Sequence, residues 1–188
     1  AAKKAGIKFG VIFQRRFWPA AQRAHKAIAD GKLGEVILGD CIVKWWRDKS
    51  YYDLDAWRGT WAGEGGAVLV NQSVHAIDMY QWLMGPVDTV YGLWANLSHP
   101  YIEAEDAAVA ALRFKNGALG IIEVTVCTKP QLGSRIQIHG KNGAGIGILE
   151  HPEGRAGVND LWTIPGEEEE NVRILAEKNA AADLPREE

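Results

Sequence analysis

The chain contains 188 residues, of which 47% are hydrophobic and 24% are charged, and its formal net charge at pH 7 is −3. A chain of this length and apolar content can bury a sizeable core as one compact unit. The small negative charge argues against nucleic acid or an anionic membrane surface as a partner, because both attract clustered lysine and arginine. The sequence also has no apolar stretch long enough to span a bilayer.

The cysteine and histidine residues show no spacing typical of a metal site. Cys41 and Cys127 are isolated in strand-like segments. We interpret them as small buried hydrophobic residues in a reducing compartment, with a disulfide between them as the alternative. His99, His139 and His151 are scattered over expected loops and strand ends. We therefore predict no metal site and a cytoplasmic location.

The N-terminal part is expected to form a helix end, a strand and a helix. Residues 1–5 resemble the end of a helix, and residues 7–13 alternate as a strand does before the cluster at 14–16. An apolar strand without neighbours exposes unpaired backbone groups, which favours pairing with another chain or disorder. A proline then opens a helix over residues 19–30, and the glycine that follows closes it.

A long strand and an aromatic loop are expected next. Residues 35–46 are rich in β-branched and aromatic side chains, and we predict a central strand there. Residues 50–58 are irregular and aromatic, which suits a loop that closes over a ligand, because ring faces stack on sugar C–H groups and a guanidinium forks to oxygens. The alternative is a loop fixed to the core by its aromatic side chains. Both interpretations stay open for Trp57 and Arg58, whereas the core-fixed one is preferred for the Tyr51-Tyr52 pair.

Residues 67–84 are expected to form one buried helix that carries candidate chemistry. Its core face is predicted from the apolar positions that recur at helical spacing, which are Val70, Val74, Ile77 and Met84. Asn71, His75, Asp78 and Trp82 are spaced four, three and four residues apart, so they share one face. A histidine whose tautomer is fixed by Asp78 suits a general acid or base. The alternative is that Asp78 and Asn71 only satisfy a core histidine.

After Pro86 the sequence changes to strands separated by turns. The candidate strands are residues 87–97, 105–114, 118–128, 131–139 and 146–149. Asn116-Gly117 is a strong signal for a hairpin turn. Short turns between consecutive strands predict an α+β fold with a large, mainly antiparallel sheet, in which the helices cover one face and leave the other open. An open apolar face requires a partner.

The C-terminal part gives weaker signals. Residues 155–165 suit one more strand at the edge of the sheet. Four glutamates at 167–170 are typical of a solvated end or a helix start. We expect residues 167–188 to form an acidic helix or a disordered tail.

Several short motifs, in order, resemble one enzyme family. They are Phe13-Gln14-Arg15-Arg16-Phe17, Gly31-Lys32-Leu33-Gly34-Glu35, Trp57-Arg58-Gly59, Gly65-Gly66 followed nine residues later by His75, Ile77-Asp78, and Phe114-Lys115-Asn116-Gly117-Ala118. Together they cover roughly residues 5–150 and resemble the C-terminal, substrate-binding part of the Gfo/Idh/MocA oxidoreductases, the family of glucose-fructose oxidoreductase and inositol dehydrogenase. The family's dinucleotide-binding half, which carries a catalytic lysine, has no match in the sequence.

The resemblance implies roles for individual residues. It implies that His75 helps to move a hydroxyl proton of a sugar or cyclitol while a nicotinamide takes the hydride, with Asp78 as the orienting group. Family members often have aspartate at the position of Asn71, and asparagine can hydrogen-bond a hydroxyl but cannot accept its proton. Arg16, Trp57 and Arg58 are candidates for substrate binding. Gln14 and Arg15 are candidates for cofactor contacts, with solvated surface charge as the alternative for the arginines.

The resemblance also predicts how the chain is organised. Residues 1–17 would be a remnant of the dinucleotide-binding domain, and residues 18–166 a substrate-binding and oligomerisation domain. NAD or NADP would be the cofactor of a longer parent and would not be held by this chain alone, and a homodimer or larger homo-oligomer would form through the open sheet face. The alternatives are a non-catalytic ligand-binding or oligomerisation module, and an NAD-dependent glycosidase or epimerase of the same fold.

Overall fold

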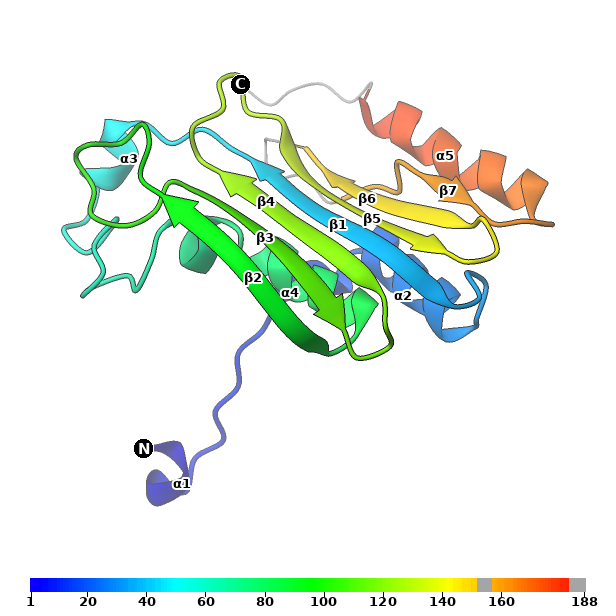
Figure 1. The fold of residues 1–188 in the computed structure, drawn as a ribbon, viewed down its shortest axis with the longest axis horizontal. Helices are drawn as coiled ribbons and strands as arrows, with labels where there is room; N and C mark the ends of the chain where they lie inside the picture. Colours follow the sequence, from blue (N-terminus) through cyan, green and yellow to red (C-terminus); the bar gives the residue numbers. More distant parts are fainter. Residues whose placement is uncertain (152–156, 183–188) are drawn as a thin grey trace.

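The computed structural model describes residues 1–151 and 157–182, with side chains to Glu177. One sheet of seven strands, in the order β2-β3-β4-β1-β5-β6-β7, organises this part of the chain (Figure 1). The strands are β1 (Val36–Lys44), β2 (Val87–Ala95), β3 (Ala107–Phe114), β4 (Leu119–Thr125), β5 (Gly133–Gly140), β6 (Gly145–Glu150) and β7 (Trp162–Thr163). Among these described strands, only the β1–β4 pair is parallel. The predicted α+β fold with a mainly antiparallel sheet is confirmed, and so is the central position of β1.

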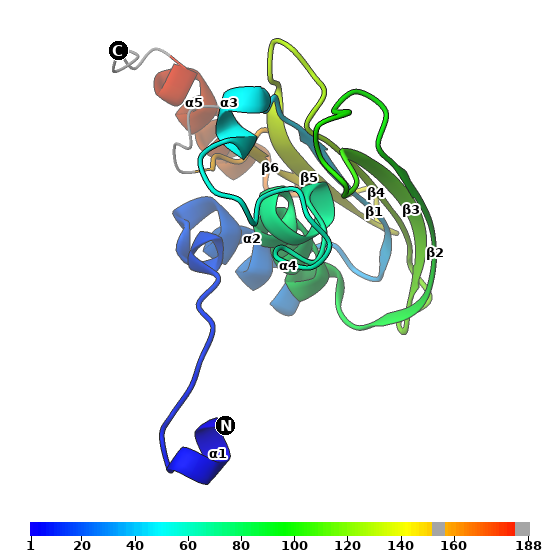
Figure 2. The same ribbon diagram turned by 90° about the vertical axis from the view of Figure 1, so that its left-hand side faces the viewer.

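The two main helices lie on the same face of the sheet. They are α2 (Pro19–Ala29) and α4 (Val74–Met84), and Figure 2 shows both on the concave side of the curved sheet. A third helix, α5 (Glu168–Ala182), lies beside α2, to which the Arg23–Glu177 ion pair of 3.0 Å joins it. The remaining helical pieces are short: α1 (Ala2–Ala5), η1 (Gln14–Phe17), α3 (Lys49–Tyr52) and the π-helical turn η2 (Val68–Gln72).

The core lies between the sheet and these helices. The small residues of α2 allow close approach to the sheet, and the larger residues of α4 fill the space above β1 and β4. The α2 residues are Ala20, Ala21, Ala24 and Ala27, and the α4 residues are Met79, Tyr80, Leu83 and Met84. The Tyr80 ring meets the Phe114 ring edge to face at 5.7 Å. Side chains of β1 alternate as expected, with Cys41 and Val43 fully buried.

The opposite face of the sheet is apolar and uncovered. Its centre is formed by Tyr91, Leu93, Val109 and Ile121, which are 70%, 60%, 50% and 45% exposed. These residues lie on adjacent strands, since Leu93 pairs with Val109 and both Tyr91 and Ile121 pair with Ala111. We call these four residues the open face. The sequence-based expectation of helices on one face and an open apolar face on the other is therefore confirmed.

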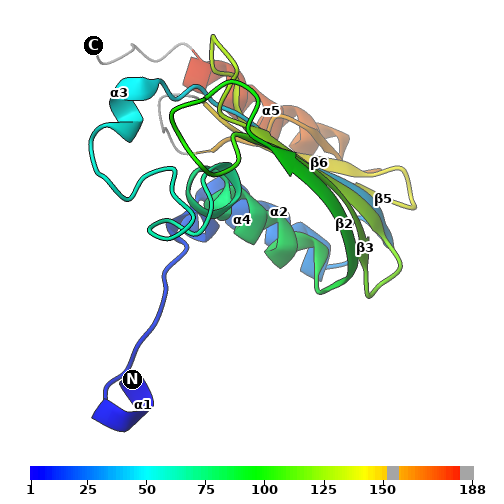
Figure 3. The same cartoon turned by 60° about the vertical axis from the view of Figure 1, so that its left-hand side comes forward.

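The predicted strand at residues 7–13 does not form. Figure 3 shows an extended segment that leads from the small α1 helix to the body of the molecule. Ile7, Phe9, Val11 and Ile12 are between 62% and 78% exposed. The alternation in this segment predicted a strand, but a strand needs hydrogen-bonding neighbours, and within the described residues this segment has no strand partner. The helix end expected at residues 1–5 is confirmed by α1.

The helix predicted over residues 67–84 is divided into two pieces. The π-turn of η2 ends at Gln72 and α4 begins at Val74, so the apolar spacing counted across the junction was wrong for the first piece. Val70, predicted to face the core, is 48% exposed. Met84, also predicted to face the core, is 2% exposed and lies there, and the rest of the buried face of α4 is formed by Ala76, Met79, Tyr80 and Leu83.

The remaining expectations are mostly met within the described residues. The hairpin turn at Asn116-Gly117 joins β3 to β4, and Gly117 has a positive φ of 88°. The expected edge strand is the short β7, the acidic run begins α5, and Cys41 and Cys127 are free thiols. Residues 152–156 and 183–188, parts of the edge-strand and tail predictions, lie outside the description. No helix in the described part is both long and apolar enough to cross a membrane.

Two glycines in strands provide a test of the packing. A Cβ at Gly120 of β4 would lie 2.8 Å from the Phe114 ring and would also meet the Tyr80 hydroxyl, whereas one at Gly92 of β2 would lie 3.4 Å from its nearest neighbour. We expect Gly120→Ala to destabilise the chain by about 1–3 kcal/mol through overpacking. The matched control Gly92→Ala should change stability by less than about 0.5 kcal/mol. Urea unfolding followed by tryptophan fluorescence measures both, and equal effects would contradict the packing of α4 on β4.

Candidate functional site

The candidate site lies where η2 joins α4. Gly66 enters this turn with φ of 148°, and a Cβ there would lie 2.8 Å from Val70 Cγ2 and 3.2 Å from Glu105 Oε1. Glu105 is 2% exposed and its Oε1 accepts hydrogen bonds from the backbone N–H groups of Ala67 and Leu69, each at 3.0 Å. The turn that carries Asn71 and leads into α4 is thus held by one buried carboxylate.

His75 lies in the first turn of α4 as a neutral imidazole. Its Nδ1 is buried and has no hydrogen-bond partner among the described residues. The Phe13 ring meets the imidazole edge to face at 6.1 Å. Burial lowers the pKa of His75, the positive charge of Arg15 lowers it further, and Asp78 opposes both. A neutral histidine can accept a proton, and because Nδ1 is buried, Nε2 is the ring nitrogen that a ligand can reach.

Asp78 is bound to Arg16. Arg16 Nε and Nη2 donate to the two carboxylate oxygens at 2.6 and 2.5 Å, in a bidentate pair. The guanidinium also lies over the Trp82 ring at 5.4 Å and the Phe13 ring at 5.8 Å. Both Asp78 oxygens are therefore used by Arg16, and the expected direct hydrogen bond from His75 is not formed. Asp78 acts on His75 through its charge and through the Arg16 pair that docks η1 against α4.

Asn71 lies in a second polar group, in η2. The junction between η2 and α4 separates it from His75, so the single helical face predicted for Asn71, His75, Asp78 and Trp82 is not continuous. Its Nδ2 donates to Glu64 Oε1 in a short hydrogen bond, and it lies 3.4 Å from the Tyr51 hydroxyl. The Tyr51 hydroxyl also accepts from Gln72 Nε2 at 2.6 Å. Sequence reasoning missed Glu64 as a site residue and favoured a core role for Tyr51. The one sequence signal for Glu64 was an acid directly before a glycine pair.

The aromatic loop brings two predicted substrate-binding residues to this group. The Arg58 guanidinium lies over the Tyr51 ring at 4.5 Å and over the Trp57 ring at 4.7 Å, and its Nε donates to Asp55 at 3.0 Å. Trp57 is 43% exposed. The exposed indole, the stacked guanidinium and Asn71 therefore border the same region through Tyr51.

The two candidate cofactor residues differ in their surroundings. Gln14 is exposed at the start of η1. Arg15 forms an ion pair of 2.6 Å with buried Glu150 and lies over the Trp18 ring at 5.4 Å. Burial lowers the pKa of Arg15, and Glu150 opposes this effect. Arg15 is therefore engaged inside the chain, and its effect at the site is the positive charge that acts on His75.

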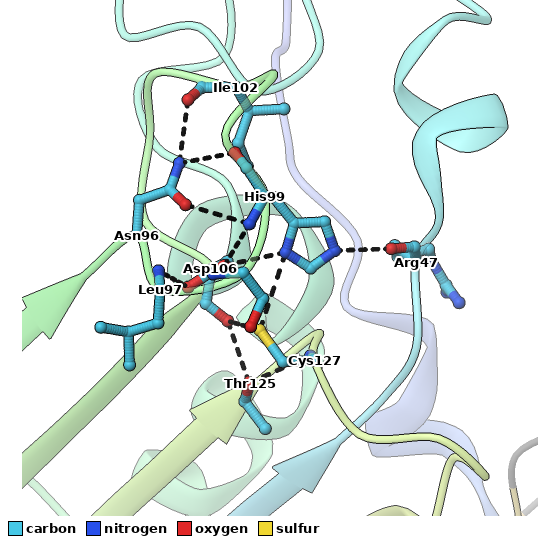
Figure 4. A network of polar contacts seen from close by, with 9 residues as sticks. Arg47, Asn96, Leu97, His99, Ile102, Asp106, Thr125 and Cys127 are labelled. Atoms are coloured by element: carbon cyan, nitrogen blue, oxygen red, sulfur yellow. Dashed lines mark hydrogen bonds and ion pairs between the residues drawn. The ribbon is translucent and has the colours of Figure 1, made fainter.

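A buried network lies at the end of the β2–β3 loop (Figure 4). His99 Nδ1 lies 2.8 Å from Asp106 Oδ2, and His99 Nε2 lies 2.7 Å from the Arg47 carbonyl oxygen. The Asp106 carboxylate also accepts from three backbone N–H groups, those of Leu97, Ser98 and His99. Burial alone would raise the pKa of Asp106, but these hydrogen bonds outweigh it and the pKa is lowered.

Cys127 completes this network, with Sγ 3.7 Å from His99 Nδ1. Donor atoms of His99, Asp106 and Cys127 all lie within 4.8 Å of one another. Sequence reasoning did not find this cluster, because its members are far apart in the chain. Since the carboxylate already accepts four hydrogen bonds, we interpret the cluster as a structural network that joins the β2–β3 loop to the end of β1.

The chain matches the family model of the GFO/IDH/MocA C-terminal domain over residues 21–145. It is 34% identical to the WlbA dehydrogenase from Bordetella pertussis, whose structure is a complex with NADH and UDP-GlcNAcA. That match has a TM-score of 0.80 and covers 98% of this chain and 57% of the other. The corresponding WlbA structure from Chromobacterium violaceum is 29% identical, with a TM-score of 0.79 over 93% of this chain and 50% of the other.

A curated relative gives a similar result. The scyllo-inositol 2-dehydrogenase (NAD(+)) from Bacillus subtilis is 27% identical over 154 residues, which cover 79% of this chain and 43% of that protein. The chain thus spans less than half the length of this relative and about half the length of the solved structures. The match to the family model covers well over half of the chain, and the chain belongs to the GFO/IDH/MocA C-terminal domain family.

Proposed function

We propose that this chain is the substrate-binding part of an NAD-dependent oxidoreductase that acts on a hydroxyl group of a sugar, cyclitol or related polyol. The observation that carries the proposal is the half-buried imidazole of His75, whose pKa is lowered by burial and by the charge of Arg15. Such an imidazole is neutral near pH 7 and can accept a hydroxyl proton at a ring nitrogen that a substrate can reach. Because Nδ1 is buried, Nε2 is the proton acceptor in this proposal.

Each residue has a defined part in this proposal. His75 accepts the hydroxyl proton, and Asn71 binds a substrate polar group. The Arg16–Asp78 pair holds η1 against α4, and Trp57 and Arg58 offer a stacking surface and a guanidinium to the sugar.

The cofactor would supply the hydride acceptor. Solved relatives were determined in complex with NADH. No glycine-rich strand–turn–helix unit that could hold the dinucleotide is found among the described residues. The fit is therefore limited to the substrate side, where Gln14 is exposed at the start of η1 and His75 is neutral. Accordingly, the cofactor would be held mainly by a preceding domain of a longer parent.

Within this class, a nucleotide-linked uronic acid is the first substrate to test. The support is the 34% identity along almost the whole chain with a dehydrogenase solved with UDP-GlcNAcA, compared with 27% for the inositol dehydrogenase. Turnover of NAD⁺ by the parent enzyme with UDP-GlcNAcA and with myo-inositol would distinguish the two classes.

The proton-transfer role of His75 can be tested in the parent enzyme. We expect His75→Gln to lower kcat by about a hundredfold to ten-thousandfold, the usual range for one general acid or base, with cofactor affinity near that of the wild type. Glutamine keeps part of the volume and hydrogen bonding, so the melting temperature should change little. A variant with normal kcat and a lowered melting temperature would remove His75 from the catalytic residues.

The pH dependence gives a second test. The pKa of His75 lies below its ordinary value, so the proton-accepting form persists to lower pH than for an exposed histidine. The acidic limb of kcat/KM should therefore lie below about pH 6.5. Because Arg15 contributes to this shift, Arg15→Gln should move the limb upward. A limb at or above the ordinary histidine range in the wild type would contradict the proposed surroundings of His75.

We also propose that the open face forms an interface between two copies of the chain. Its support is four adjacent apolar residues, each 45% exposed or more, on a sheet whose other face is covered. Contiguous apolar patches of this kind are rare on monomers. We expect light scattering at tens of micromolar to give a dimer or larger species, and Leu93→Lys to shift it toward the monomer. Val172→Lys, at a residue that is 71% exposed on α5, is the control and should leave the mass unchanged.

A further inference from the structure

The hydrogen bonds of Glu64 fix the orientation of the Asn71 amide. A carboxylate only accepts hydrogen bonds, so the Asn71 group that faces Glu64 Oε1 must be the NH₂ group. The second neighbour, the Tyr51 hydroxyl, already accepts from Gln72 at 2.6 Å and lies 3.4 Å from the same NH₂ group. The Tyr51 hydroxyl is compatible with this orientation, and the Glu64 carboxylate is the neighbour that selects it.

This orientation leaves the Asn71 carbonyl oxygen for a ligand. Within the described residues no group donates a hydrogen bond to Oδ1, and this oxygen is not among the buried unpaired atoms. Asn71 therefore presents an acceptor in the turn that precedes α4, although an asparagine in general offers either a donor or an acceptor.

Glu64 is itself held in place. Its Oε2 accepts a hydrogen bond from the Gly59 backbone N–H at 2.5 Å. Gly59 has φ of 69°, and a Cβ there would lie 2.5 Å from Ile102 Cγ2, so this backbone is fixed against the β2–β3 loop. The Gly59 carbonyl also accepts from the backbone N–H groups of Glu103 and Ala104 at 2.8 and 3.0 Å. The carboxylate is thus preorganised before any ligand arrives.

We propose that Glu64 is a positioning residue that makes Asn71 a dedicated hydrogen-bond acceptor for a donor group of the substrate, such as a sugar hydroxyl or an acetamido N–H. This inference rests on the proposed function for its ligand, but the orientation itself belongs to the chain alone. It also explains a residue choice, because aspartate at position 71 would place two carboxylates against each other.

The proposal is tested first on the stability of this chain. Asn71→Asp should lower the melting temperature at pH 8 by roughly 3–8 °C, because a repulsive pair replaces a hydrogen bond. Adding Glu64→Gln should restore most of this loss, because the side-chain amide introduced at position 64 then donates to the new carboxylate. The matched control, Glu103→Gln, alters an acid whose carboxylate accepts from Trp61 N–H at 3.3 Å and should not restore it.

The pH dependence of this loss has a defined sign. Two adjacent carboxylates favour retention of a proton in the folded state, so the deficit of Asn71→Asp relative to wild type should be large at pH 8 and shrink toward pH 5. The ionisable groups around the pair are Tyr51, Tyr52, Arg58 and Glu105, which are common to all variants, and His75, whose imidazolium a carboxylate at position 71 would favour. The Asn71→Asp/Glu64→Gln variant keeps any coupling to His75 and removes only the carboxylate pair, so the pH dependence that belongs to the pair is the part that this double variant loses. A deficit that is equal at both pH values, or that Glu103→Gln restores as well as Glu64→Gln, would overturn the proposal.

The second test uses the parent enzyme with UDP-GlcNAcA and NAD⁺. Glu64→Gln alone frees the amide to rotate, so KM should rise about tenfold while kcat changes less than threefold, since roughly one hydrogen bond is lost in the ground state and transition state alike. The Glu64→Gln/Asn71→Asp double variant again presents an acceptor oxygen and should recover KM. If Glu64→Gln leaves KM unchanged in an active enzyme, the positioning role is wrong. Failure of the wild type to turn over would instead count against the proposed function, while the stability result would stand.

Discussion

The site depends on two consecutive buried carboxylates at the start of β3. Glu105 binds the backbone of the turn that enters η2, and Asp106 binds the backbone of the β2–β3 loop together with His99. A buried carboxylate is costly unless it is hydrogen-bonded, and backbone N–H groups in irregular turns have the same requirement. Asp106 accepts hydrogen bonds at both oxygens, and Glu105 accepts two at Oε1, so each carboxylate is bound by backbone N–H groups that would otherwise lack a partner. Glu105 and Asp106 directly precede β3, which lies between β2 and β4 in the sheet, so two irregular segments are fixed to an interior strand.

Two neighbouring arginines of η1 also fix an irregular segment to the sheet and to α4, each through an ion pair. Arg15 reaches Glu150 at the end of β6, and Arg16 reaches Asp78 on α4. The two ion pairs differ in exposure, with Arg15 and Glu150 at 14% and 1% and Arg16 and Asp78 at 34% and 10%. Removal of one partner is expected to lower the free energy of unfolding more for the Arg15–Glu150 pair, because the charge that remains is more buried and stays away from water. Together the pairs hold η1 next to His75 and place one positive charge near the imidazole.

The sequence was informative where structure follows from local pattern. The central strand at β1, the strands after Pro86, the Asn116-Gly117 turn and the helix closed by Gly31 each depend on neighbouring residues, and the structure contains them. The strand predicted at residues 7–13 does not form, because a strand also needs a hydrogen-bonding partner. The interrupted helix was missed because a π-turn changes the spacing on which the prediction relied, so Val70 was assigned to the wrong face. Glu64 and the His99 network were missed because their contacts join residues far apart in the chain or in irregular loops. No periodicity or spacing rule describes such contacts, and a resemblance supplies only the residues that the family motifs contain.

The neutral residue at position 71 fits the electrostatics of His75. Family members often have an aspartate at the position of Asn71, and an asparagine cannot accept a proton as that aspartate can. In the structure, the charges that act on the pKa of His75 are those of Arg15 and Asp78, and burial with Arg15 outweighs Asp78. A further carboxylate one turn away would favour the imidazolium and oppose this balance. An amide whose NH₂ group is bound by Glu64 offers the same acceptor oxygen to a ligand without adding that charge. In the proposed reaction, Asn71 would thus accept a hydrogen bond and the His75 imidazole would accept a proton, two functions that one aspartate would combine.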